Sequence, residues 1–384
     1  MKILLIKAMN DGHLYTRFTY ALQRALLELG HDAVVSDQSI HVVDGAAPAN
    51  HLLAELQATR YDAVLSFSSF FGGVLLNDGR SLFDALGVKF IGWQLDHPIY
   101  APQSLVKAMI GRYAIYANPN HVRFAQAVKL PGRGMTMLPG AAPPSDKPMP
   151  YKQRELSVLI AATWNGEPQR LWEQLEDSPG KRLMAGFVDH LMADREASVL
   201  DAFNQTAEKL KLGARLGNDA NFDAQIRNFL CEPLTYVRNA DRIEIIRALV
   251  DAGLPVTICG GGWESFLGPR TNVTYIERMS FDELSALYGK ARVVLNLNAG
   301  NGGCERALHA ALAGAAVLSD QSRALSDLFG DAIGVFNRAK PETAARVAQR
   351  LLDQGEDVAH RGQQAVNRHG LWRHRAQQIV EFVS

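Results

Sequence analysis

The chain has 384 residues, of which 47% are hydrophobic and 21% charged, a composition typical of a globular protein with ample apolar surface to bury. This length exceeds what one ordinary hydrophobic core accommodates and predicts two domains. The 40 basic residues balance the 40 acidic ones, which gives no reason to expect nucleic acid as a partner. No stretch reaches the roughly 18 continuous apolar residues that a membrane-spanning helix needs.

Short apolar runs alternate with helical patterns along the first 145 residues, which is typical of a parallel sheet wrapped by helices. Residues 14–29 have apolar side chains at helical spacing and stop before Gly30, which is a helix C-cap signal. The sequence predicts a doubly wound first domain over residues 1–145. Its strands are predicted at 2–8, 32–37, 61–69, 88–96, 113–119 and 135–142.

The proline-rich stretch 139–150 is the best candidate for a linker. A second series of strands follows it, and the second domain is expected over residues 155–370. The terminal helix, within 371–384, is expected to pack back on the first domain. Strands of the second domain are predicted at 156–164, 254–263, 272–278, 293–298 and 315–320, with a mostly helical pattern over 165–250.

Polar and glycine residues follow several of these strands. His13 lies just after the first strand, Asp96 ends the strand that precedes Pro98, and Gly260 to Trp263 follow the strand VTIC. Ligands of open α/β sheets bind at the carboxyl ends of the strands. The sequence therefore predicts an α/β protein of two Rossmann-like domains that face each other across a ligand cleft.

The stretch from Val293 to Phe329 is the most informative part of the chain. It is read as a buried strand, a glycine-rich loop and a helix of small residues. In this order the free backbone N–H groups at the start of the helix point towards the loop, which favours an anion. An ordinary tight turn explains the glycines equally well, but Glu305, Arg306 and His309 near the helix start favour a ligand site.

Four segments of the chain are similar to a known family. They are GWQLDHP in the first half, and LPVTICGGGWE, NVTYIERMSFDELSALYGKARVVLNLN and RALHAALAGAAVLSD in the second. On these segments the chain resembles the group-1 and spore-maturation (CgeB-like) glycosyltransferases, which have the GT-B fold. The resemblance is good over residues 240–330, and the spacing from Arg306 to Gly314 is its most specific part.

The resemblance implies a hexosyltransferase that moves a sugar from a nucleotide-diphosphate sugar to a glycan, a lipid-linked sugar or a protein. The nucleotide sugar would be a co-substrate, with no permanently bound cofactor. The chain has no Asp-x-Asp motif, which agrees with catalysis without a metal. Three cysteines without a disulfide or zinc pattern indicate a reducing cytoplasm, and a peripheral membrane contact is left open.

Two chemical roles follow for such an enzyme. Positive charge must stabilise the departing diphosphate, and loop amides together with Arg306 would supply it. A base must deprotonate the acceptor, and we assign Asp96 to this step with His13 as the alternative. The thiol of Cys304 is expected to have a lowered pKa at a helix N-terminus, although no partner marks it as a nucleophile.

Position 309 departs from the family pattern, which has a glutamate there that binds the donor ribose. Either His309 substitutes with weaker binding, or Glu305 has taken over, or the site has lost donor binding. Trp263 either stacks on the nucleobase or packs against the sheet. The donor-binding residues are predicted as Gly260, Gly262, Trp263, Asn298, Gly302, Gly303, Cys304, Glu305 and His309.

Other classes of function remain open at this stage. A nucleotide-sugar 2-epimerase has the same two-domain cleft, but no acidic cluster of the kind it needs stands out. A non-catalytic nucleotide-sugar-binding scaffold would explain the departure at His309. NAD-dependent chemistry is disfavoured, because KAMNDGH follows the first strand where a Gly-x-Gly-x-x-Gly motif would be expected.

Overall fold

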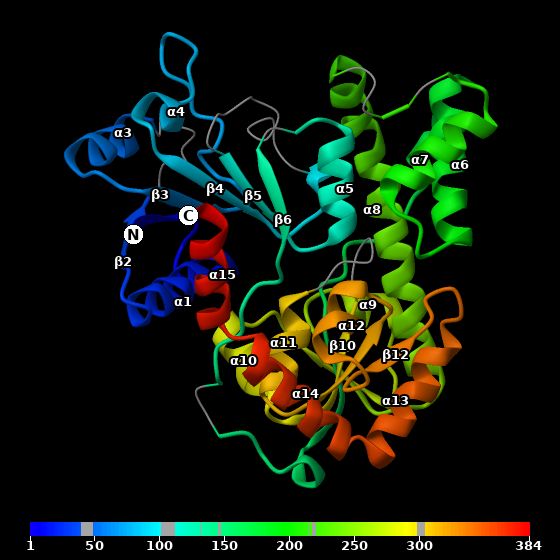
Figure 1. Ribbon diagram of the computed structural model, residues 1–384. Helices are drawn as coiled ribbons and strands as arrows, with labels where there is room; N and C mark the ends of the chain where they lie inside the picture. Colours follow the sequence, from blue (N-terminus) through cyan, green and yellow to red (C-terminus); the bar gives the residue numbers. More distant parts are fainter. Residues whose placement is uncertain are drawn as a thin grey trace. The chain divides into compact units, whose positions relative to one another are not determined.

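The computed structural model of the protein describes residues 1–39, 49–100, 112–130, 132–144, 147–213, 215–216, 220–297 and 304–384, with the side chains of 49 and 220–228 left aside. It divides into two compact units (Figure 1). Unit 1 comprises Met1–Ala142 together with Gly370–Ser384, and unit 2 comprises Pro143–His369. Each unit contains a six-stranded sheet.

The sheet of unit 1 is parallel throughout and has the strand order β2-β1-β3-β4-β5-β6. Its central strands are fully buried, as expected for a sheet covered on both faces. The strands are β1 (Lys2–Lys7), β2 (Asp32–Asp37), β3 (Ala63–Phe67), β4 (Lys89–Gln94), β5 (Arg112–Tyr116) and β6 (Arg133–Thr136). The helices are α1 (Leu14–Glu28), α3 (Ala49–Ala58), α4 (Leu82–Leu86), α5 (Pro119–Ala127) and α15 (Trp372–Val383).

The last helix, α15, packs on unit 1 with Trp372 at its start. The indole of Trp372 packs against Phe18 of α1 and Trp93 of β4, with ring centroids 5.1 and 5.8 Å apart. Gly140 lies close to the backbone of Trp372, because a Cβ added to Gly140 would lie 2.6 Å from Cα of Trp372. This contact holds the C-terminal segment on the same unit as the N-terminal strand.

The sheet of unit 2 is also parallel, with the order β12-β11-β10-β7-β8-β9. Strand order therefore reverses between β7 and β10, which is where ligands of such sheets bind. The strands are β7 (Leu156–Ala161), β8 (Val256–Cys259), β9 (Val273–Ile276), β10 (Ala291–Asn296), β11 (Ala316–Asp320) and β12 (Gly334–Phe336). The helices are α6 (Pro179–Ala193), α7 (Val199–Lys209), α8 (Ala220–Asp251), α9 (Trp263–Leu267), α10 (Phe281–Tyr288), α11 (Glu305–Leu312), α12 (Arg323–Phe329), α13 (Glu342–Gln354) and α14 (Glu356–His369).

These two sheets confirm the predicted α/β class with two Rossmann-like halves. The sequence prediction missed the short strand β12 and placed β6 two residues too late. The mostly helical pattern predicted over 165–250 is confirmed, and the structure divides it into α6, α7 and the 32-residue helix α8. The cleft expected between the two domains stays a prediction.

Arg154 holds together the amino-end side of the second sheet. Its guanidinium donates to the carbonyl oxygen of Ala291 at 2.8 Å, where β10 begins, and to that of Ala313 at 2.8 Å, where α11 ends. It also donates to Met149 at 3.0 Å and Tyr288 at 3.4 Å. A cation at helix C-termini is favoured by the helix dipole, so this one side chain satisfies carbonyl groups of several elements at once.

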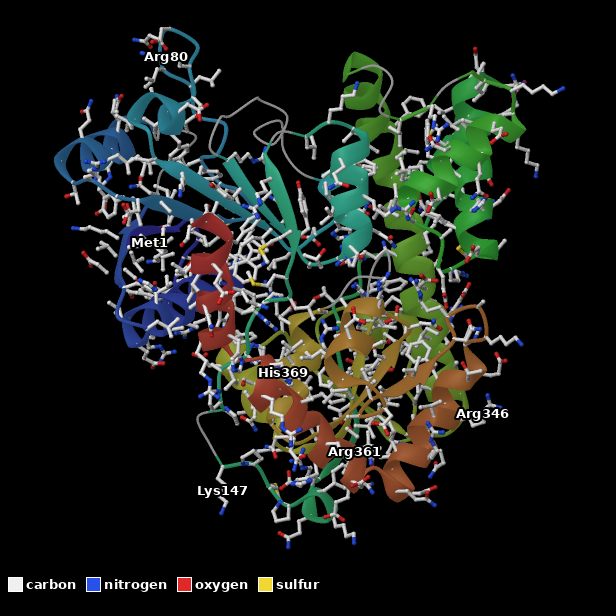
Figure 2. All side chains as sticks on the ribbon, in the orientation of Figure 1. Met1, Arg80, Lys147, Arg346, Arg361 and His369 are labelled. Atoms are coloured by element: carbon white, nitrogen blue, oxygen red, sulfur yellow. The ribbon has the colours of Figure 1, made fainter. Side chains whose placement is uncertain are left out.

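We expect Arg154→Met to lower the free energy of unfolding by about 3 kcal/mol or more, because several buried carbonyl groups lose a charged donor. Urea unfolding measures the loss. Arg361→Met is the matched control, because Arg361 lies on the surface of α14 (Figure 2) and pairs only with exposed Asp331 and Asp357 among its printed ion pairs. Such a surface pair contributes about 1 kcal/mol at most. Equal losses in the two variants would contradict the role of Arg154.

Candidate functional site

The carboxyl ends of β7 and β10 form the candidate site in unit 2. Thr163 and Trp164 follow β7, and Cys304 precedes α11 on the far side of the loop that leaves β10. The predicted residues Asn298, Gly302 and Gly303 lie outside the described residues. The site is therefore described from the side chains at the ends of β7 and β8, on α8 and at the start of α11.

Arg306 lies in the first turn of α11 and is half-buried. Its guanidinium is hydrogen-bonded to the hydroxyl of Tyr288, whose ring is buried at the end of α10. Burial alone would lower the pKa of Arg306, but the neighbouring Cys304, Tyr288 and Glu305 outweigh it and raise that pKa. Arg306 is thus a fixed positive charge at the start of the helix.

Two further arginines, Arg238 and Arg242, lie on α8, and the sequence prediction missed both. Arg242 donates from Nη1 to the carbonyl oxygen of Thr163 at 3.0 Å. Burial lowers the pKa of Arg242 to about 10, and repulsion from the charges of Arg238 and Arg306 adds to the shift. The spacing of Arg238 and Arg242, one turn apart on a helix, is the sequence signal that could have found them. The charges of Arg242 and Arg306 therefore interact at the point where the strand order reverses, and Arg238 lies one turn before Arg242 on α8.

A buried ion-pair network fixes α8 in this position. Asp241 pairs with Arg195 through one carboxylate oxygen and with Arg338 at 3.1 Å through the other. Arg338 also pairs with Asp320, at the end of β11, at 3.2 Å. All four side chains are less than a tenth exposed. Asp241 therefore ties α8, between Arg238 and Arg242, to the carboxyl edge of the sheet.

The expected lowered pKa of the Cys304 thiol is wrong. Cys304 caps α11 by position but makes no side-chain cap bond, and its sulfur contacts Glu305 Oε2 at 3.1 Å. Burial and the adjacent carboxylate of Glu305 raise the pKa of this thiol to about 12. Burial outweighs the helix dipole here, so Cys304 stays protonated at neutral pH and is a small neutral residue beside Arg306.

His309 lies one turn further along α11 and is 4% exposed. Its ring packs edge-on against Phe281, with centroids 5.0 Å apart. Burial lowers the pKa of His309 to about 4, so the imidazole is neutral at pH 7. Glu305, on the same face, is half-buried and contacts Cys304. The donor contacts predicted for Glu305 and His309 stay predictions.

The glycines after β8 are required by packing. Gly260 has φ +138°, and an added Cβ would lie 2.2 Å from the carbonyl oxygen of Ala162. Gly262 has φ +88°, and its added Cβ would lie 2.8 Å from Cβ of Trp164. The amide of Trp164 in turn donates to the carbonyl oxygen of Gly261 at 3.0 Å. The loop after β8 is therefore packed tightly along the loop after β7, and a phosphate contact at Gly260 and Gly262 stays a prediction.

Trp263 packs in the core, the alternative to base stacking that the sequence left open. Its indole is fully buried, and its Nε1 donates to the carbonyl oxygen of Ala162 at 2.8 Å. Nearby, Trp164 is only half-buried, and its ring stacks on Phe266 with centroids 4.0 Å apart. Trp164 therefore remains partly accessible, as Phe266 does, and the sequence analysis did not single out either residue.

His13 and Asp96 belong to unit 1, and each follows a parallel strand. His13 caps α1, where its Nδ1 accepts the amide of Tyr15 at 3.2 Å. An acceptor at Nδ1 means that the neutral ring carries its proton on Nε2, so Nε2 is a donor and not a base. Asp96 is exposed after β4. Because β3 lies between β1 and β4, the strands that lead to these residues are about 10 Å apart.

Strained backbone lies between them at the end of β3. Ser68 and Ser69 have φ of 55° and 52°, a left-handed conformation that is unfavourable for residues other than glycine. Ser69 is fully buried and accepts a hydrogen bond from Gln94 Nε2 at 2.5 Å. Such strain is common at functional sites, and a ligand at this edge of unit 1 stays a prediction.

Two classes of structure receive no support in the described part of the chain. No group of three His, Cys, Asp or Glu side chains there is arranged to hold a metal ion. No helix among those residues has the length and apolar character to cross a membrane.

We expect Gly260→Ala to destabilise unit 2 by about 2 kcal/mol or more, because the methyl group collides with backbone in a conformation that L residues rarely adopt. Gly261→Ala is the control. Its added Cβ has no neighbour closer than Glu277 Oε2 at 3.9 Å, so the change should be small. Thermal unfolding of both variants compares them, and equal midpoints would argue against the packing role.

Buried His309 predicts a loss of stability in acid. Its pKa is about 4 in the folded protein against 6.5 when exposed, so the neutral ring contributes its full stability above pH 6.5. That contribution falls as the pH drops from 6.5 towards 4, by about 3 kcal/mol over the interval. We expect His309→Gln to lose correspondingly less stability between pH 7 and 4 in urea unfolding. Parallel losses in the variant and the natural protein would show that His309 does not titrate in this way.

Part of the chain is similar to a known protein family. Residues 238–381, which include all three arginines, match a family model described as "Glycosyl transferase-like". No curated protein matches the chain.

Solved structures are similar over the whole length. Sucrose-phosphate synthase from Thermosynechococcus elongatus is 11% identical, with a TM-score of 0.53 and 99% and 98% of the two chains covered. WaaG, a glycosyltransferase involved in lipopolysaccharide biosynthesis, is 11% identical, with a TM-score of 0.56 and coverage of 100% and 99%. An alpha-glucosyltransferase in complex with UDP is 8% identical, with a TM-score of 0.53 and coverage of 99% and 98%. Because the sequence identities are this low, the similarity to these structures shows a shared fold alone. Residues 238–381 are thus a glycosyl transferase-like segment, and the chain has the two-domain α/β fold of the GT-B glycosyltransferases.

Proposed function

We propose that the protein transfers a hexosyl group from a nucleotide-diphosphate sugar to a glycan, lipid-linked or protein acceptor. The observation that carries this proposal is that Arg242 and Arg306 lie within reach of each other's charge at the point where the strand order of unit 2 reverses. The charges of Arg242 and Arg306 repel each other, so an anion bound between these two side chains is favoured. The matched family and the fold support a phosphorylated sugar donor as that anion.

The diphosphate would lie between Arg242 and Arg306, at the start of α11. When the bond from the sugar C1 to the phosphate oxygen breaks, its electron pair passes to the diphosphate. The two guanidinium groups then stabilise the charge that grows there, without a metal. Glu305, at the start of α11, and His309, one turn further along, would bind the donor ribose.

The acceptor would bind at the carboxyl edge of unit 1. The acceptor oxygen forms the new bond to C1, and in an inverting course its proton passes to a carboxylate. Asp96 is exposed at the end of β4 and carries out this step in our proposal. His13 is less suited to it, because its Nδ1 lone pair already accepts the amide of Tyr15. We place the enzyme in the cytoplasm, with a peripheral membrane contact where the acceptor is lipid-linked.

Nucleotide binding tests the proposal. Thermal unfolding is measured with UDP, GDP, dTDP and CMP and their common sugars, with NAD as a negative control. A ligand at a hundred times its Kd adds ~2.7 kcal/mol to stability, which shifts the midpoint by several degrees. We expect one nucleoside diphosphate to give this shift, and Arg242→Met and Arg306→Ala to remove it while the unliganded proteins stay folded.

Arg346→Met, at an exposed position on α13 (Figure 2), is the control and should keep the shift. Turnover of the matching nucleotide sugar should fall about a hundredfold in Arg306→Ala and be insensitive to EDTA. Binding without turnover under any condition would favour a non-catalytic nucleotide-sugar-binding protein. No binding of any nucleotide would contradict the proposal.

A further inference from the structure

Trp164 differs from the other tryptophans of the chain in its exposure. The chain has five tryptophans, and Trp93, Trp172, Trp263 and Trp372 are at most 4% exposed. Trp164 is half-buried, and it lies on the loop that follows β7 at the ligand-binding edge of the sheet. A large aromatic side chain left partly open beside an anion site indicates a contact surface for a ligand.

The indole of Trp164 is held rigidly from several sides. It stacks on Phe266 with an interplanar angle of 20°, and its centroid lies 5.2 Å from that of Trp263. The backbone amide of Trp164 donates to the carbonyl oxygen of Gly261. Because Gly262 has no Cβ, there is room beside it for the Cβ of Trp164. A ring fixed in this way loses little conformational entropy when a ligand binds to it.

Phe266 is itself sandwiched. The guanidinium of Arg247 lies 4.5 Å from the centroid of the Phe266 ring, and Trp164 stacks on that ring at 4.0 Å. Since one ring face holds one partner, the three groups form a layered stack of guanidinium, phenyl and indole. The stack lies towards α9, which follows β8.

The position of Trp164 relative to the arginines shows what such a surface would bind. Thr163, the residue before it, accepts the hydrogen bond of Arg242 through its carbonyl oxygen. Arg306 lies on the β10 side of β7, whereas the ring contacts of Trp164 lie on the β8 side. A ligand that extends across β7 would therefore meet cations at one end and the partly exposed indole of Trp164 at the other.

We propose that Trp164 stacks on the nucleobase of the donor while Arg242 and Arg306 bind its diphosphate. This assignment rests on the proposed function and names the part of the donor that the β8 side of the site recognises. Stacking on an aromatic ring accepts any base, so Trp164 supplies affinity for the nucleotide without selecting among bases. Selection among bases then falls to hydrogen-bonding groups elsewhere.

Binding of UDP, GDP, dTDP and pyrophosphate to the full-length protein tests this proposal by calorimetry and by tryptophan fluorescence. Pyrophosphate has the anion without the base. We expect Trp164→Ala to raise the Kd of the nucleotide that binds most tightly by about 5- to 100-fold and to leave the Kd of pyrophosphate unchanged. Trp164→Phe should keep the nucleotide Kd within a few-fold and remove the fluorescence change. Trp172→Phe, which replaces a buried indole, should keep both the nucleotide Kd and the fluorescence change.

Each other outcome has a definite meaning. If Trp164→Ala weakens nucleotide and pyrophosphate equally, Trp164 only supports the fold of the site, and the proposal is wrong. It is also wrong if Trp164→Ala weakens UDP-glucose but not UDP, because the contact is then with the sugar. Loss of pyrophosphate binding in Arg306→Ala, together with no effect of Trp164→Ala, would keep the proposed function and reject the base contact. Failure of both nucleotides and pyrophosphate to bind would reject both proposals.

Discussion

The candidate site depends on the buried ion pairs of Asp241. This carboxylate binds Arg195 and Arg338, and Arg338 continues to Asp320 at the end of β11. Buried charges lose their hydration, so such a network is tolerated only when each group has partners, and those partners define one position of α8. Because Arg238 and Arg242 flank Asp241 on that helix, the same network sets where these two cations lie over the sheet.

Unit 2 therefore contains two groups of arginines that differ in the charges around them. In the network, Arg195 and Arg338 are matched by Asp241, Asp320 and the partly exposed Glu244. At the ligand edge, Arg242 is held beside the like charges of Arg238 and Arg306, and after burial their repulsion is what lowers its pKa. Like charges gathered at the carboxyl end of a parallel sheet are a feature of sites that bind anions.

Much of the fold follows from sequence patterns, but contacts between distant segments do not. Alternating apolar runs predict the parallel sheets, and the polar start of α11 directs attention to Arg306. Arg238 and Arg242 were missed because they lie on α8, far along the chain from that helix, and only the strand order brings them together. The thiol of Cys304 was misjudged because a helix terminus can be read from sequence, whereas burial, which raises its pKa, cannot.

The three glycines after β8 also show that contacts between distant segments cannot be predicted from sequence patterns. A glycine that lets a phosphate approach and a glycine that lets another loop approach look identical in sequence. At Gly260 and Gly262 the approaching group is the loop after β7, at Ala162 and Trp164 respectively. If Trp164 stacks on the base, Gly262 still contributes to ligand binding, but it does so by making room for the indole. A side chain at Gly262 would then weaken nucleotide binding through displacement of Trp164, without itself touching the phosphates.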